Sequence, residues 1–65
     1  MNLVKKMRIL AGLSRHELAE KSGFSYTILS SWENGRTLPS PKKLHVLADA
    51  LGCTVEELLP LYEKK

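Results

Sequence analysis

The sequence of 65 residues has few of the residue types on which many functional classes depend. Its single cysteine, Cys53, cannot form an internal disulfide or supply the paired thiolates of a zinc finger. His16 and His45 share no ligand pattern with Cys53, so we expect no metal site. No apolar run reaches the roughly 18 residues that span a bilayer, and residues 1–6 lack a secretory-signal pattern. These absences predict a reduced, cytoplasmic protein without a membrane span.

Signs of catalysis are also missing from the sequence. It contains no glycine-rich phosphate loop and no set of serine, histidine and acid that stands out. A chain this short has little room for the concave site of several hundred Å³ in which small molecules usually bind. We therefore expect no enzyme, no cofactor and no small-molecule ligand, and binding of a macromolecule becomes the better hypothesis.

Composition and periodicity together predict one small all-α domain. The hydrophobic content of 43% is normal for a globular chain and too high for an intrinsically disordered one. Between the glycines, apolar residues recur at helical spacing instead of alternating. We expect a single domain over residues 1–65, with its core in residues 3–59 and a C-terminal tail in residues 60–65.

Capping signals divide this domain into five helices. The first is expected over about residues 2–11, before Gly12. A capping box at Ser14 begins a second helix over about 15–21, and Ser25 begins a third that runs to residue 33. Ser40 and Pro41 begin the fourth helix, which ends before Gly52.

The fifth helix and the end of the chain are read in the same way. Thr54 and Glu57 repeat the capping box, and Pro60 is expected to stop this helix after one or two turns. Lys64 and Lys65 are expected to be frayed.

The second and third helices are joined by only about three residues around Gly23. Ala19 is small enough to let the two backbones approach, and a short turn forces a steep crossing. This arrangement is a helix-turn-helix.

Three stretches then resemble the Cro/phage-repressor (XRE-like) DNA-binding family. They are Arg15–Ser25, Ile28–Arg36 with the run Trp-Glu-Asn-Gly inside it, and Ala48–Leu59, and the resemblance covers about residues 5–59. It implies a compact five-helix, lambda-repressor-like fold of prokaryotic or phage origin. It also implies binding to double-stranded DNA, usually as a homodimer and usually to control transcription.

The outward face of the third helix is the candidate base-reading surface, because in such docking this helix enters the major groove. The resemblance places Tyr26, Thr27 and Ser31 at base-reading positions. Ser30 is a further candidate, and Ile28 either packs on a base methyl or lies at the helix edge. The alternative for all of them is a merely solvated helix face.

This face lacks arginine, glutamine and asparagine, which make bidentate contacts to guanine or adenine. We therefore expect few direct hydrogen bonds from this face to the bases. Thr27 and Tyr26 would contact thymine methyls, serine hydroxyls would serve either base, and DNA shape and bridging water would supply much of the specificity.

Basic residues gather in the same part of the chain. Residues 1–45 hold eight Lys and Arg against three Glu, a net +5, whereas residues 46–65 hold two Lys against four acids, a net −2. Arg15 stands in the first turn of the second helix, where the helix dipole already favours an anion. The candidate phosphate-binding residues are Arg15, Ser25, Arg36, Thr37, Lys42 and Lys43, for which the alternative is simple solvation.

Arg8 lies within the apolar stripe of the first helix, where an unpaired charge is costly. Glu33 is its natural partner, and the resemblance implies the same ion pair. The alternative is an exposed Arg8 on a rotated first helix.

Apolar residues near the C-terminus are either a subunit interface or part of the core: Leu59, Leu61 and Tyr62. The leading functional hypothesis is a sequence-specific, homodimeric repressor of transcription. The alternative is a protein-interaction module, such as an antitoxin or adaptor with secondary autoregulatory DNA binding.

Overall fold

The computed structural model describes residues 2–63, and this part of the chain is helical without strands. Its elements are α1 (Leu3–Leu10), α2 (Arg15–Ser22), α3 (Tyr26–Glu33), α4 (Pro41–Leu51), α5 (Val55–Leu58) and the 3₁₀ helix η1 (Leu59–Tyr62). The all-α, five-helix prediction is confirmed, and the first four helices begin and end within about one residue of the expected positions. Within residues 2–63, no helix has the length and apolar character needed to cross a membrane.

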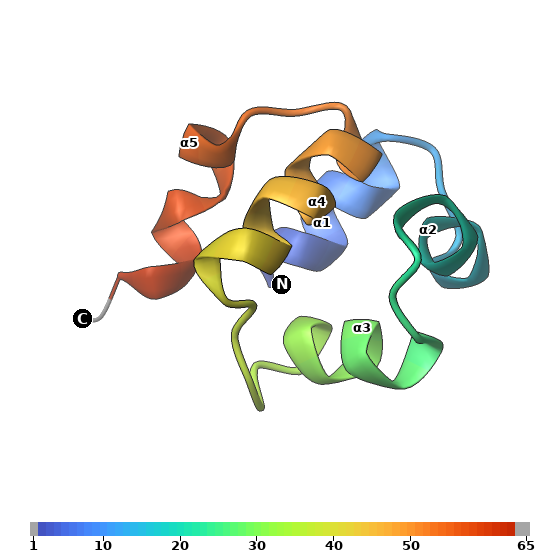
Figure 1. The fold of residues 1–65 in the computed structure, drawn as a ribbon, viewed down its shortest axis with the longest axis horizontal. Coiled ribbons are helices and arrows are strands. Elements are labelled where there is room, and N and C mark those ends of the chain that lie inside the picture. Colours follow the sequence, from blue (N-terminus) through green and yellow to red (C-terminus); the bar gives the residue numbers. More distant parts are fainter. Residues whose placement is uncertain (1, 64–65) are drawn as a thin grey trace.

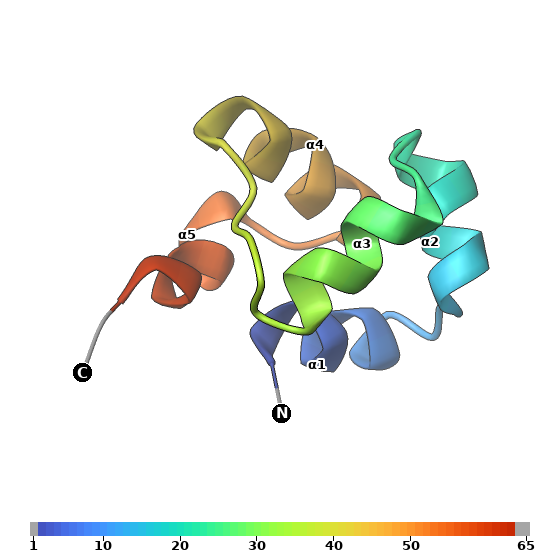
Figure 2. The ribbon, with the colours of Figure 1, turned by 90° about the horizontal axis from the view of Figure 1, so that it is seen from below.

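The helices surround a small common core (Figure 1). α2 packs against both α3 and α4, whereas α1 packs against α3 and η1. Seen from below, α3 lies across the face nearest the viewer, and the extended segment after it leads to α4 (Figure 2). One side of α3 is therefore left open.

Each of the five α-helices contributes at least one buried apolar side chain to the core. The largest fully buried side chains are Trp32, Leu18, Leu29, Leu47, Leu58 and Val4. Phe24, in the turn before α3, packs edge-on against Trp32 with ring centroids 5.0 Å apart. Trp32 is thus a core residue, and its packing with Leu29 fixes the inner side of α3 against the domain.

Side-chain caps begin the helices where the sequence predicted. The Ser14 hydroxyl accepts a hydrogen bond from the Glu17 N–H at 3.0 Å, and the Glu17 carboxylate accepts one from the Ser14 N–H at 2.8 Å. Ser25 caps α3 by accepting from the Ile28 N–H at 3.1 Å. These bonds satisfy amide donors that the helix itself leaves free.

Gly23 makes the tight turn between α2 and α3. Its φ is +83°, in the left-handed region that glycine adopts at little cost. Its N–H donates to the carbonyl of Ala19 at 2.9 Å, which closes the end of α2. The chain can then enter α3 after two further residues.

The predicted fifth helix is confirmed, because α5 is one turn long and ends at Leu58, before Pro60. The structure continues from α5 into η1, where proline stands in the first turn and its missing N–H is not needed. Leu61 packs against the core, and the Tyr62 hydroxyl donates a hydrogen bond to the carbonyl of Pro39. The expected fraying of Lys64 and Lys65 lies outside the described residues.

Candidate nucleic-acid interface

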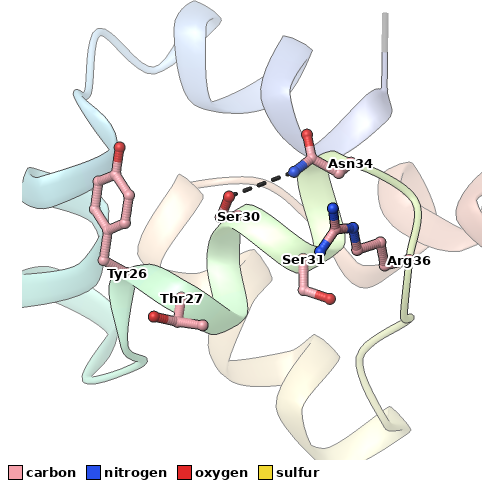
Figure 3. A pocket seen from close by; sticks show the side chains of 6 residues that line it. All are labelled: Tyr26, Thr27, Ser30, Ser31, Asn34 and Arg36. Atoms are coloured by element: carbon pink, nitrogen blue, oxygen red, sulfur yellow. Dashed lines mark hydrogen bonds between the residues drawn. The ribbon is translucent and has the colours of Figure 1, made fainter.

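The outward face of α3 is hollowed at its centre. Ser30 and Ser31 are small and lie between the larger Tyr26 at one end and Asn34 and Arg36 at the other (Figure 3). The hollow has a volume of about 320 Å³ and is lined by Tyr26, Thr27, Ser30, Ser31, Asn34 and Arg36. Four of the five predicted base-reading residues therefore share one surface.

Ile28 is the predicted base-reading residue that the structure places elsewhere. It is half-buried and packs against the core, and it does not line the hollow. The reason is its position next to Leu29, on the flank of α3 that closes the core. Asn34 was missed, because the sequence indicated only that it ends α3; its amide donates to the Ser30 hydroxyl at 3.5 Å.

Tyr26 is held between two side chains of α2. The Arg15 guanidinium carbon lies 5.2 Å from the centroid of the Tyr26 ring, within the range of a cation–π contact. The His16 and Tyr26 ring centroids are 4.5 Å apart, with the planes tilted by 33°. The ring at the beginning of the hollow is thereby oriented before any ligand binds.

Arg15 is engaged by the protein itself. Its Nη1 donates to the Tyr26 hydroxyl at 3.3 Å and to the Ser30 hydroxyl at 3.5 Å, and its Nη2 donates to Glu33 Oε1 at 3.0 Å. The hydrogen bond to Glu33 raises the pKa of Arg15, against the opposing effect of burial. Arg15, which the sequence predicts as a phosphate-binding residue, is therefore already bonded within the protein at the start of α2.

Glu33 joins three helices through a single carboxylate. Its side chain is 1% exposed, and Arg8 Nε donates to its Oε2 at 2.8 Å. Arg8 Nη1 also donates to the carbonyl of Leu13 at 2.8 Å. Burial alone would raise the pKa of Glu33, but hydrogen bonds and charge attraction from Arg8 and Arg15 outweigh it and lower the pKa.

The ion pair expected between Arg8 and Glu33 is thus present. The alternative of an exposed Arg8 does not hold, because this side chain is only 12% exposed. The second arginine on the same carboxylate, Arg15, was not foreseen.

The other predicted phosphate-binding residues are exposed but dispersed. Arg36 borders the hollow, and the Thr37 hydroxyl is hydrogen-bonded to the Ser31 hydroxyl at 2.9 Å. Lys42 and Lys43 lie apart from the hollow, exposed in the first turn of α4. Ser25 is exposed at the beginning of α3, where its hydroxyl is already used as the cap.

Comparison with known proteins agrees with this geometry. A helix-turn-helix family model matches residues 4–58. The chain belongs to the Cro/C1-type (XRE) helix-turn-helix family. It is 43% identical over 54 residues, or 83% of this chain and 70% of the relative, to the uncharacterised HTH-type transcriptional regulator y4dJ of Sinorhizobium fredii. No solved structure matches the chain.

This helix-turn-helix domain belongs to a family of DNA-binding transcription regulators. Its candidate DNA surface is the hollow of α3, with Arg15 and His16 behind Tyr26. Within residues 2–63, no group of three or more His, Cys, Asp and Glu side chains is arranged to hold a metal ion. Cys53 is half-buried, and burial raises the pKa of its thiol.

A second surface of the helix-turn-helix domain lies between α4 and the C-terminal helices. It is an apolar groove of about 250 Å³, lined by Pro41, Leu44, His45, Val55, Leu59 and Tyr62. Leu59 is 48% exposed there. Leu61, which the sequence grouped with these residues as a possible subunit interface, instead packs against the core.

Proposed function

We propose that this domain binds duplex DNA sequence-specifically by placing α3 in the major groove, and that it represses transcription by blocking polymerase. The observation that carries the proposal is the contrast between the two sides of α3. Leu29 and Trp32 are buried, whereas Tyr26 and Thr27 are exposed around a hydroxyl-lined hollow. An α-helix of about 10–12 Å diameter fits a major groove about 12 Å wide.

Charge supports the same orientation. The net +5 of residues 1–45 belongs to the part of the chain that contains the helix-turn-helix, and the net −2 belongs to its C-terminal part. Lys42 and Lys43 are exposed and available to phosphates, in contrast to Arg8 and Arg15, which bind Glu33. Such an asymmetry steers the domain toward DNA with one face forward.

The base-reading role of the hollow is tested by selection of bound duplexes from a random library. The selection is repeated with Tyr26→Ala and with Val46→Ala, a control at an exposed α4 residue outside the hollow. We expect Tyr26→Ala to change the preferred sequence and Val46→Ala to leave it intact. Failure of the unmodified protein to select any sequence, or a preference that survives Tyr26→Ala, would contradict the proposal.

We further infer that two copies bind together through the apolar groove. One α3 of eight residues is only about 12 Å long, so it covers few base pairs, and two half-sites would supply the missing specificity. Pro41 is followed by Lys42 and Lys43, while Val55 is followed by Glu56 and Glu57. A two-fold contact can therefore set basic residues of one copy near acidic residues of the other.

The dimer is tested by analytical ultracentrifugation of the protein on a selected duplex. We expect two copies on half-sites about 34–36 Å apart or a multiple of this spacing, and one copy with Leu59→Lys. A single copy on a single half-site for the unmodified protein would contradict the dimer. A different protein recovered on the groove, with Leu59→Lys abolishing its binding and leaving DNA binding unchanged, would favour an interaction module.

A further inference from the structure

The chain reverses at the end of α3 and brings Arg36 onto the outward face of this helix. Gly35 has a φ of +74°, and its N–H donates to the carbonyl of Trp32 at 3.2 Å. The Arg36 N–H then donates to the carbonyl of Ser31 at 3.0 Å. This pair of bonds closes the helix and fixes the Arg36 backbone one turn above Ser31.

A hydrogen bond between two side chains fixes the chain directly after Arg36. Thr37 and Ser31 are joined through their hydroxyls at 2.9 Å. Because Ser31 is bonded to the backbone of Arg36 and to the side chain of Thr37, the Arg36 side chain leaves the loop in a defined direction. Figure 3 shows it pointing back over the last turn of α3, toward Ser31 and Asn34.

The Arg36 guanidinium is available for a ligand. Among residues 2–63 it takes part in no hydrogen bond or ion pair, although it lines the hollow together with Tyr26 and Thr27. The guanidinium groups of Arg8 and Arg15 differ from it, because both donate hydrogen bonds to Glu33. The candidate DNA surface therefore carries an arginine that α3 itself does not contain.

We propose that Arg36 reads a guanine in the major groove, beside the base pairs that face Ser30 and Ser31. The proposal rests on the proposed function of α3. A guanidinium donates two parallel hydrogen bonds to O6 and N7 of guanine, whereas hydroxyls accept and donate to any base. Over the small serine side chains, the hollow leaves space for the edge of a base pair to approach the guanidinium.

The chemical alternative is a phosphate contact, which would involve charge without base preference. Arg36→Lys separates the two, because lysine keeps the charge but loses the planar pair of donors. Duplexes are selected from a random library with the unmodified protein and with Arg36→Lys. Lys43→Met serves as the control for loss of a phosphate-binding charge.

We expect a guanine at one position of the selected sequence, and a loss of its preference by roughly 10- to 100-fold in Arg36→Lys, with the other positions unchanged. Lys43→Met should weaken binding to all sequences alike. Thermal unfolding followed by circular dichroism should have the same midpoint in Arg36→Lys as in the unmodified protein, since the side chain makes no internal bond.

Two results would overturn the proposal and are distinguishable from each other. If the unmodified protein selects no sequence, the proposed function and the role of Arg36 fail together. If it selects a sequence that Arg36→Lys also prefers, the role of Arg36 alone fails. In the second case, a uniform weakening by Arg36→Met, with a salt slope smaller by about one, would assign Arg36 to a phosphate.

Discussion

Glu33 connects α3 to the two helices that precede it. It lies at the end of α3, and its carboxylate accepts from Arg8 of α1 and from Arg15 of α2. A carboxylate that is 1% exposed has lost its hydration, so these bonds are what keep it ionised inside the domain. Arg15 in turn touches Tyr26, which links the buried carboxylate to the candidate DNA surface.

Removal of the shared carboxylate should cost more than removal of either single partner. Glu33→Ala leaves Arg8 and Arg15 without their counter-charge, and we expect a loss of about 3–5 kcal/mol of unfolding free energy. Arg8→Met leaves Arg15 on Glu33 and should cost about 1 kcal/mol. Urea unfolding at low temperature measures both. Equal, small losses would show that Glu33 is not the common partner.

The lowered pKa of Glu33 predicts loss of stability in acid. Between its folded pKa and its ordinary value of 4.5, the unfolded chain binds more protons, so stability rises with pH across this window. The contribution of ionised Glu33 to the unfolding free energy is fully present above about pH 4.5 and is lost as the pH falls through its folded pKa.

Urea midpoints at pH values between about 2 and 6 measure this dependence in the unmodified protein and in Glu33→Gln. The variant should show a weaker slope. Some slope should remain, because the backbone hydrogen bond from Ser14 also lowers the pKa of Glu17. An identical slope in both proteins would mean that Glu33 does not titrate as described.

The sequence predicted Arg8 as a partner of Glu33 but did not predict Arg15 as one, and the difference has a physical reason. Arg8 sits among apolar residues of its own helix, so its need for a partner is visible locally. The partners of Arg15 come from across the turn, where Tyr26, Ser30 and Glu33 form one stripe of α3. Their approach depends on how α2 and α3 cross, which residue types in sequence do not specify.

The helix boundaries depend on local signals and were predicted well from the sequence. The features that depend on tertiary contacts were not. The caps at Ser14, Ser25 and Ser40 are bonds within three residues, so the sequence is sufficient to place them. The 3₁₀ helix η1 was not predicted, because Leu61 and Tyr62 stabilise it by contacts with the distant core and Pro39. Arg36 was predicted as a phosphate-binding residue, but its place above Ser31 was not predicted, because it depends on the turn after α3.

The turn between α2 and α3 provides a prediction at this scale. A Cβ at Gly23 would meet no atom within 4 Å, so the cost of Gly23→Ala is that of the left-handed backbone alone. We expect a loss of about 1–2 kcal/mol in urea unfolding. Gly23→Asn is the matched control and should lose less, because asparagine tolerates this conformation better. Equal losses in the two variants would mean that the left-handed backbone at residue 23 does not determine the loss of stability.

At the scale of the whole molecule, the domain has two unlike surfaces. One contains the hollow of α3 with the exposed Arg36, and the other contains the apolar groove beside α4. The first suits a polyanion and the second suits another protein surface. The proposed dimer on DNA would use both surfaces at once.

The salt dependence of DNA binding measures the phosphate contacts of the whole DNA-binding surface. The logarithm of the DNA association constant should fall with the logarithm of salt concentration at a slope of several units, because bound phosphates release counterions. Lys43→Met should reduce the slope by about one for each bound copy, and Asp49→Asn, a control at an exposed residue of α4 outside both the hollow and the groove, should not change it. Fluorescence anisotropy with a labelled duplex gives the slope. Affinity that is independent of salt would contradict the proposed phosphate contacts.

The proposed function requires that the outward face of α3 lies against DNA. Amide chemical shifts recorded by NMR during titration with a selected duplex test it residue by residue. We expect the largest shifts at residues 26–31 and at Arg36, with small shifts at the buried Leu47 and Leu58. Shifts concentrated in α4 and α5, with α3 unchanged, would contradict the account.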